Sequence, residues 1–217
     1  MRFDTLVLGA GIVGVSVAVH LQKRGRAVAL VDRRAPGFET SFGNAGLIQR
    51  EGVYPYAFPR DLSTLLRYAG NTSADVHYHP GDLPRLLPFL WQYWRNSHPT
   101  RHAAIARAYA PLIAHSVSEH RALAEAAGAT HLIRPSGWIK VFRTSLLGGL
   151  RYTEADSVSD PNALVTAYAK HFEQLGGRLF EADANTLTPN APWLLQTKEG
   201  ELRADNVVIA MGPWADV

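Results

Sequence analysis

Residues 3–34 read FDTLVLGAGIVGVSVAVHLQKRGRAVALVDRR. The apolar run Leu6–Leu8 predicts a buried strand, and a pattern with helical spacing follows it and ends near Gly25. A second apolar run, Ala27–Val31, predicts another strand that stops at Asp32. Strand, helix and strand together form a βαβ unit, which predicts an α/β fold with a parallel sheet.

Three glycines stand at the turn from the first strand into the helix, with the spacing G-x-G-x-x-G: Gly9, Gly11 and Gly14. The first allows the tight turn, the second lets a pyrophosphate approach the backbone, and the third lets the helix pack close to the sheet. The helix N-terminus favours an anion. Asp32 follows the fingerprint by about 20 residues, where a carboxylate accepts from a ribose 2′-hydroxyl. The pattern therefore predicts a dinucleotide site.

Composition narrows the class of protein. The chain has 217 residues, 47% hydrophobic and 19% charged, which suits one sizeable core or a nucleotide domain with a smaller cap. It has no cysteine, so disulfides, thiolate metal sites and a cysteine nucleophile are excluded. The formal charge of +3 comes from scattered arginines without a basic run. We therefore expect no nucleic acid among its partners.

The sequence also allows predictions about the location of the protein in the cell and about metal binding. The first strand begins within a few residues of Met1, with no signal-peptide succession before it, and no apolar run is long enough to span a bilayer. We expect a cytoplasmic protein, with peripheral attachment at the inner membrane left open. His77 and His79 lie two apart and His98 and His102 four apart, but no carboxylate or cysteine cluster completes either pair. We expect no metal site.

The rest of the chain divides into recognisable segments. Residues 50–94 interleave prolines with aromatic residues, which predicts short helices and turns that cap an apolar surface. The other expected elements are a helix over 100–127 with a bend at Pro111, a hairpin of 132–134 with 138–142, a helix from Asp160 to Leu175, a hairpin of 193–197 with 201–204, and a buried strand over 206–210.

Five segments in order carry a resemblance that covers nearly the whole chain. They are the glycine fingerprint, VDRRAPGFETSFGNAGLIQ at 31–49, GWIKVFRT at 137–144, SVSDPNALV at 157–165 and VVIAMGPWAD at 207–216. As a set they resemble FAD-dependent D-amino acid dehydrogenases of the D-amino acid oxidase and glycine oxidase superfamily. The resemblance implies that the cofactor is FAD.

The resemblance also implies site residues. By this resemblance, the FAD pyrophosphate would contact Gly9, Gly11 and Gly14, and the adenosine ribose would contact Asp32, with Arg33 beside it. The loop against the flavin would comprise Ser41, Asn44, Ala45 and Gly46. Ala184 would offer backbone contacts to the adenine, and Ala210 and Gly212 would form a second turn that contacts the nucleotide. No catalytic residue is assigned, because the family carries those residues largely in a C-terminal half. Trp138 and Tyr152 are the cap residues that we expect nearest to the flavin.

The implied architecture has two parts. Residues 1–49 and 148–217 match a discontinuous Rossmann-like FAD-binding domain, with a parallel sheet and a β-meander, and residues 50–147 match part of an α+β substrate cap. Two departures from the family stand out. Ser145–Leu147 replaces a helical portion of the cap, and the sequence stops at Val217. We expect the C-terminal half, with its clamp for the substrate carboxylate, to be absent.

The implied reaction is oxidative deamination of D-amino acids to 2-oxo acids and ammonia, by hydride transfer to flavin N5. The expected electron acceptor is a membrane quinone or an electron-transfer chain. One alternative is a catalytically incomplete FAD-binding fragment or subunit, completed by a partner chain or a homo-oligomer. A second alternative is an NAD(P)-dependent Rossmann dehydrogenase, but further βαβ repeats do not follow the second strand.

Overall fold

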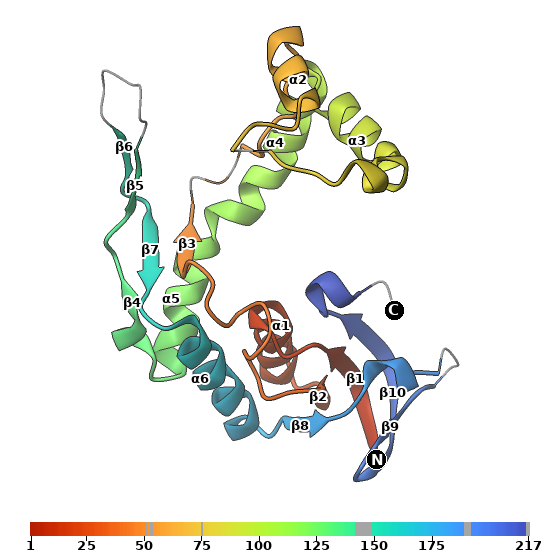
Figure 1. Cartoon of the computed structure of the whole chain (residues 1–217). Helices are drawn as coiled ribbons and strands as arrows, with labels where there is room; N and C mark the ends of the chain where they lie inside the picture. Colours follow the sequence, from red (N-terminus) through yellow and green to blue (C-terminus); the bar gives the residue numbers. More distant parts are fainter. Residues whose placement is uncertain (51, 53, 75, 142–148, 189–191, 216–217) are drawn as a thin grey trace. The chain divides into compact units, whose positions relative to one another are not determined.

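The computed structural model describes residues 1–50, 52, 54–74, 76–141, 149–188 and 192–215. The chain forms two compact units, drawn in Figure 1: unit 1 comprises Met1–Ile48 and Val117–Val217, and unit 2 comprises Gln49–Ser116. The domain boundaries expected from the sequence, 1–49 with 148–217 and 50–147, stay a prediction. The shortened segment at 145–147 lies outside the described residues.

Unit 1 is built on a five-stranded sheet. In the order across the sheet, the strands are β8 (Arg178–Glu181), β2 (Val28–Asp32), β1 (Arg2–Leu8), β10 (Gly200–Ile209) and β9 (Trp193–Thr197). The first four run parallel, and β9 pairs antiparallel with β10 as the predicted hairpin. This mixed sheet, with a βαβ unit at its centre, confirms the predicted α/β, Rossmann-like fold class.

One face of the sheet is covered by two helices, α1 (Ile12–Lys23) and α6 (Pro161–Gln174). Helix α6 begins where the sequence predicts, because the Asp160 carboxylate caps it by accepting from the Ala163 N–H at 2.9 Å. Its side chains Tyr168 and Phe172 are fully buried against α1 and the strands. Burial of each such side chain stabilises the fold by roughly 1.5–3 kcal/mol.

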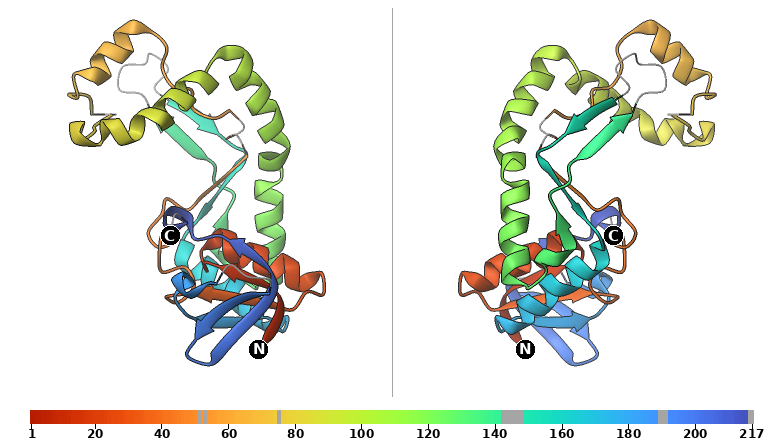
Figure 2. Two further views of the ribbon diagram at one scale, coloured as in Figure 1. Left: turned by 90° about the vertical axis from the view of Figure 1, so that its right-hand side faces the viewer. Right: turned by 90° about the vertical axis from the view of Figure 1, so that its left-hand side faces the viewer.

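The opposite face of the sheet has a second apolar cluster that the strands themselves supply. Its large members are Phe3, Leu6, Leu8, Val31, Phe180, Leu195 and Leu202. Leu195 and Leu202 come from the β9–β10 hairpin, drawn in blue in Figure 2, and both are fully buried. Leu195 and Leu202 lie opposite each other in the hairpin, and side chains that lie opposite each other point to the same face of a sheet. The hairpin therefore contributes to the same core as the parallel strands.

Two smaller sheets complete the strands of unit 1. One has the order β3 (Leu47–Gln49), β7 (Ala155–Val158) and β4 (Ile133–Arg134), and the other pairs β5 (Trp138–Val141) with β6 (Gly149–Tyr152). The predicted hairpin of 132–134 with 138–142 was wrong. Gly137, at φ +64°, donates its N–H to the Ala155 carbonyl, so the turn sends the two strands into different sheets.

The predicted helix over 100–127 is two helices, α4 (Pro99–Ala114) and α5 (Ser116–Ala126), with a short 3-10 helix, η2 (Thr130–Leu132), after them. The interruption falls at His115 and not at Pro111, which lies inside α4. Proline removes one helical hydrogen bond, and the helix ends within one further turn. In unit 1, the Arg121 guanidinium pairs bidentately with the buried Asp156 carboxylate at 2.6 Å, which ties α5 to β7.

Unit 2 contains α2 (Leu62–Ala69), η1 (Pro80–Asp82), α3 (Leu83–Asn96) and α4, as the proline- and aromatic-rich sequence predicts. Among its described residues, only Ser97 and Ala106 are buried. Polar contacts to the backbone take the place of a large core. Ser97 Oγ accepts from the Phe58 N–H at 2.8 Å, and the Tyr93 hydroxyl donates to the Tyr56 carbonyl at 2.8 Å.

We predict that Gly14→Ala destabilises unit 1. An added Cβ would lie far inside van der Waals contact with the Gly9 carbonyl oxygen, so α1 would have to move from β1. The expected loss is about 1–3 kcal/mol of unfolding free energy, measured by urea denaturation followed by circular dichroism. Gly81→Ala is the control, because a Cβ there meets no atom within 4 Å. Equal stability of the two variants would contradict this account of the glycine.

We also predict that stability falls as the pH drops through about 6.5, because of His120. Burial lowers the pKa of His120, which packs against the Tyr168 ring and lies 3.4 Å from its hydroxyl. The unfolded chain therefore takes up the proton first as the pH falls, which favours unfolding. His120→Gln should flatten the dependence of the denaturation midpoint between pH 7 and 5, and the exposed His131→Gln should leave it unchanged.

Candidate functional site

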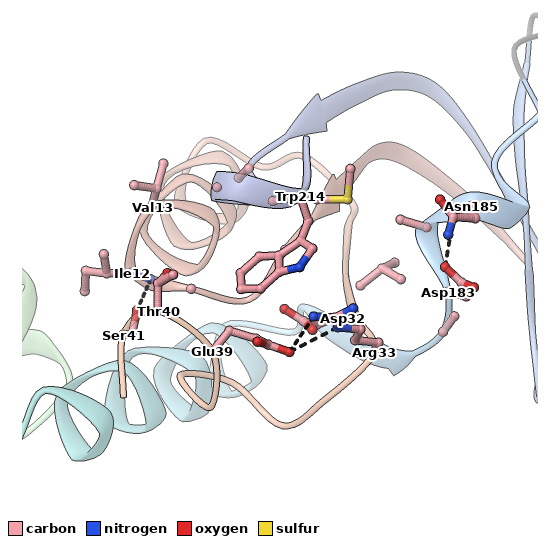
Figure 3. Close-up of a pocket in the computed structure, with 18 residues that line it drawn as sticks. Ile12, Val13, Asp32, Arg33, Glu39, Thr40, Ser41, Asp183, Asn185 and Trp214 are labelled. Carbon is pink, nitrogen blue, oxygen red and sulfur yellow. Dashed lines mark hydrogen bonds and ion pairs between the residues drawn. The ribbon is translucent and has the colours of Figure 1, made fainter. Parts of the chain in front are cut away.

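A cavity of about 350 Å³ lies in unit 1 where the parallel strands end (Figure 3). Its lining comes from segments 9–13, 31–41, 182–185 and 210–214, which follow or close β1, β2, β8 and β10. All four parallel strands thus contribute their carboxyl ends to one site. In open α/β sheets, ligands bind in the crevice outside these ends, where the strand order reverses.

Backbone hydrogen bonds hold the four strand ends together at the cavity. They run from the N–H groups of Gly9, Ala182 and Ala210 to the carbonyl oxygens of Val31, Asp32 and Leu8, at 2.7, 3.0 and 2.8 Å. Each bond extends a strand pairing by one residue into the loop that follows. The first residues of the loops therefore have fixed positions, and among the residues beyond them Arg33, Glu39, Asp183 and Trp214 line the cavity.

Glycine is required at the three fingerprint positions for different physical reasons. Gly9 has φ +102°, and a Cβ there would strike the Ala210 carbonyl group. Gly14 does not line the cavity; it is required by packing, because a Cβ would strike the Gly9 carbonyl oxygen. A Cβ on Gly11 would meet only Ser41 Oγ, at 3.6 Å. Gly11 therefore leaves the backbone accessible from the cavity, which fits close approach of a ligand.

The N-terminus of α1 opens at the cavity. Its N-cap residue, Gly11, has no side chain to accept from the first-turn N–H groups. The Ile12 N–H donates to Ser41 Oγ at 3.2 Å, and Ser41 is buried. The first turn of a helix carries unpaired N–H groups and the positive end of the helix dipole. This end of α1 is therefore suited to an anionic group such as a diphosphate.

Asp32 ends β2 and is half-buried at the cavity. Its Oδ2 accepts from the Ala10 N–H at 2.6 Å, and its Oδ1 accepts from the Arg34 N–H at 3.1 Å. The carboxylate is therefore oriented by the glycine turn on one side and by its own loop on the other. Each oxygen has a second lone pair, so the group can still accept from a ribose hydroxyl.

Arg33 also lines the cavity, beside Asp32. Its Nε and Nη2 both lie 3.0 Å from Oε1 of Glu39, and its Cζ lies 5.0 Å from the centre of the Trp214 ring. Figure 3 shows the indole within the cavity, above this ion pair. The arginine is thus held between a carboxylate and an aromatic face, both supplied by loops that follow strands.

Of the loop residues predicted to lie against a flavin, only some line the cavity. Ser41 lines the cavity, but Asn44, Ala45 and Gly46 do not. The Asn44 side chain donates to the Ser41 carbonyl at 3.0 Å and accepts from the Gly46 N–H at 2.7 Å, so it shapes the loop. Gly46 has φ +59° and accepts from the Val158 N–H at 2.6 Å. Their contact with a cofactor stays a prediction.

The other predicted residues, Ala184, Ala210 and Gly212, line the cavity. Ala184 begins the 3-10 helix η3 (Ala184–Thr186), and Gly212 begins η4 (Gly212–Trp214). Sequence reasoning missed Glu39 and Trp214, although both lie in segments quoted for the resemblance. Their position in the sequence could have indicated them, because each lies in a loop that follows a predicted parallel strand.

The remaining candidates lie elsewhere. Trp138 and Tyr152 stack on each other with ring centroids 4.4 Å apart and do not line the cavity. Within the described ranges, no three His, Asp or Glu residues gather as a metal-ion site, and the absence of a metal stays a prediction. None of the helices in the described part of the chain is both long enough and apolar enough to cross a membrane.

Comparison with known proteins gives a consistent result. The family model described as FAD dependent oxidoreductase (DAO) matches residues 4–217. A D-amino-acid oxidase of Bradyrhizobium diazoefficiens is 29% identical over 254 residues, which cover 95% of this chain and 59% of that protein. D-amino acid dehydrogenase 1 of Mesorhizobium japonicum is 32% identical over 140 residues, with 64% and 34% covered. The chain thus spans between a third and three fifths of these relatives' lengths.

Solved structures share the fold. NikD, described as an unusual amino acid oxidase essential for nikkomycin biosynthesis, gives a TM-score of 0.58 at 16% identity, with 98% of this chain and 52% of NikD covered. Glycine oxidase from Bacillus cereus ATCC 14579 gives 0.57 at 17% identity, with 98% and 57% covered. At this level of identity, the likeness concerns the fold alone.

We predict that Asp32→Ala weakens the binding of ADP by at least about tenfold, because a charged acceptor for the ribose is worth about 1.5–3 kcal/mol. Titration calorimetry measures the affinity, and circular dichroism checks that the variant is folded. Asp205→Ala is the control, since Asp205 is an exposed residue that pairs with Arg2. Unchanged ADP affinity in a folded Asp32→Ala variant would exclude this carboxylate as the ribose acceptor.

Proposed function

Because the chain belongs to the DAO family of FAD-dependent oxidoreductases, we propose that its cavity binds FAD and that the protein oxidises an amino acid. FAD is the cofactor of this family. The observation that carries the proposal is the cavity itself, where the glycine turn, the N-terminus of α1 and the Asp32 carboxylate face one space. These groups suit a diphosphate and a ribose.

The residues present fit the adenosine and diphosphate portion of FAD. Gly11 leaves the backbone open, and the first turn of α1 supplies N–H donors for the diphosphate. Asp32 is oriented to accept from the ribose. Ala184 and Ala210 line the cavity with small side chains, which allow a planar ring system to approach the backbone. Arg33 also lines the cavity, where it pairs with Glu39.

The proposed reaction is oxidative deamination of a D-amino acid to a 2-oxo acid and ammonia. The relatives named D-amino-acid oxidase and D-amino acid dehydrogenase support this substrate class. FAD, when bound, supplies the acceptor for the hydride. The part of this chain is to bind and orient: donors on α1 and the Asp32 carboxylate hold the nucleotide portion, which positions the rest of the cofactor. Positioning is worth several kcal/mol of the activation barrier in such reactions.

A second candidate is an FAD-binding portion that needs further chain for turnover. The observation that favours it is coverage, since the chain spans 34–59% of the relatives' lengths. A quinone or electron-transfer chain as electron acceptor, a complementing chain or homo-oligomer, and a cytoplasmic or peripheral membrane location all remain parts of the proposal. The two candidates share the same cofactor site and differ in turnover.

We predict that the purified chain retains FAD after gel filtration, with flavin absorption near equimolar to protein, and that anaerobic D-alanine or D-proline bleaches it. L-alanine is the control for stereochemistry, and Asp32→Ala is the control for specific retention of the cofactor. Bleaching by the D-amino acids alone supports the first candidate, and retained colour without bleaching supports the second. Absence of retained flavin would contradict the proposed cofactor site.

A further inference from the structure

The end of β2 presents two side chains with opposite preferences for the 2′ position of a bound adenosine. A carboxylate at this place accepts from a free ribose 2′-hydroxyl, whereas an arginine nearby accommodates a 2′-phosphate. Both Asp32 and Arg33 line the cavity. Asp32 and Arg33 alone therefore do not define whether the cavity prefers a free or a phosphorylated ribose. That preference depends on the residues that contact them.

Glu39 engages the arginine. Its Oε1 accepts from the Nε of Arg33 at 3.0 Å and lies 3.0 Å from Nη2 of the same guanidinium. The Nε of Arg34 lies 3.3 Å from the same oxygen. The Trp214 ring covers the guanidinium of Arg33, with Cζ 5.0 Å from the ring centre. The Nε–Nη2 edge, one of the two edges with which an arginine can bind a phosphate bidentately, is thus already used by a carboxylate oxygen. The loop from Arg33 to Glu39 is short, so this contact is local.

The charged side chains that line the cavity are mostly acidic. Asp32, Glu39 and Asp183 are negative and Arg33 is positive, while Arg34 pairs with Glu39 from outside the lining. The Glu39 side chain is only 21% exposed. A 2′-phosphate carries a charge of about −1.5 to −2. It would gain Arg33 only by displacing Glu39, which would leave that carboxylate half-buried without its main partner, beside a second anion. A free hydroxyl requires no such exchange, because it donates to Asp32.

We propose that Glu39 is a specificity-determining residue: by holding Arg33, it makes the cavity bind adenine nucleotides with a free 2′-hydroxyl and reject those with a 2′-phosphate. The inference rests on the proposed function, because it takes the cavity to bind an adenine nucleotide. It adds a reason why the cavity takes ADP-like and FAD-like ligands and excludes 2′-phosphorylated dinucleotides, although an arginine stands next to the ribose acceptor.

The test compares two probes, ADP and adenosine 2′,5′-bisphosphate, by titration calorimetry on the wild-type chain and on Glu39→Gln. Glutamine keeps the length of the side chain and an acceptor oxygen but removes the charge. In the wild type, ADP should bind at least about tenfold more tightly than the bisphosphate. In Glu39→Gln, the bisphosphate should bind about tenfold more tightly than before, as expected for a charge-assisted hydrogen bond, while ADP affinity changes by less than about threefold.

Two further variants separate this role from a general change of charge. In the double variant Arg33→Gln, Glu39→Gln, the gain in bisphosphate affinity should disappear, because the gain depends on a released Arg33. Glu199→Gln removes the same charge at the opposite end of the sheet, where Glu199 pairs with Arg178. It should leave the ratio of the two affinities unchanged.

The outcomes are distinct. A wild-type chain that binds ADP and discriminates as described, with discrimination lost in Glu39→Gln and restored in the double variant, supports the inference. Equal binding of both probes by the wild type, or an unchanged ratio in Glu39→Gln, overturns the inference and leaves the proposed function standing. A wild-type chain that binds neither probe overturns the proposed function and the inference together.

Discussion

The hydrogen bond from the Ala10 N–H to the Asp32 carboxylate, 2.6 Å long, joins the two features on which the site depends. It connects the glycine turn after β1 to the end of β2, and it orients the carboxylate at the cavity. The turn has this shape because Gly9 adopts φ +102° and Gly14 lets α1 lie against the Gly9 carbonyl. A side chain at either glycine would strike the carbonyl group of Ala210 or of Gly9, so the turn that donates to Asp32 would have to move.

The cavity is formed by loops that leave the well-packed sheet of unit 1. This sheet has an apolar cluster on each face, one under α1 and α6 and one shared by the parallel strands and the β9–β10 hairpin. Loops that leave such a sheet are held at their first residues by strand hydrogen bonds, so they can present polar groups at defined positions. Unit 2 has few buried residues among those described, and its contacts are mainly polar and aromatic.

Several features could be predicted from the sequence because they depend on residues close together in the chain. The βαβ unit, the N-cap of α6 by Asp160 and the β9–β10 hairpin are of this kind. The hairpin expected around Pro135–Gly137 failed for the opposite reason. A turn signal states that the chain reverses, but the partners of β4 and β5 are strands that follow much later, β7 and β6. Strand pairing is decided by competition among all available edges, which a local pattern does not contain.

The α/β class, the glycine turn and the acidic residue at the end of β2 could all be predicted from the amino-acid sequence, because backbone freedom and strand propensity act over a few residues. The sequence also placed Arg33, Ser41, Ala184, Ala210 and Gly212 in segments that the cavity uses. Three contacts at the site became known from the folded chain: Asn44 shapes its loop, and Glu39 and Trp214 enclose Arg33. The contact of Trp214 with Arg33 joins the loops that follow β10 and β2, whose strands flank β1, so only the assembled sheet brings the two residues together. The contacts of Asn44 and Glu39 lie within the loop after β2, and residue types alone do not fix the course of such a loop.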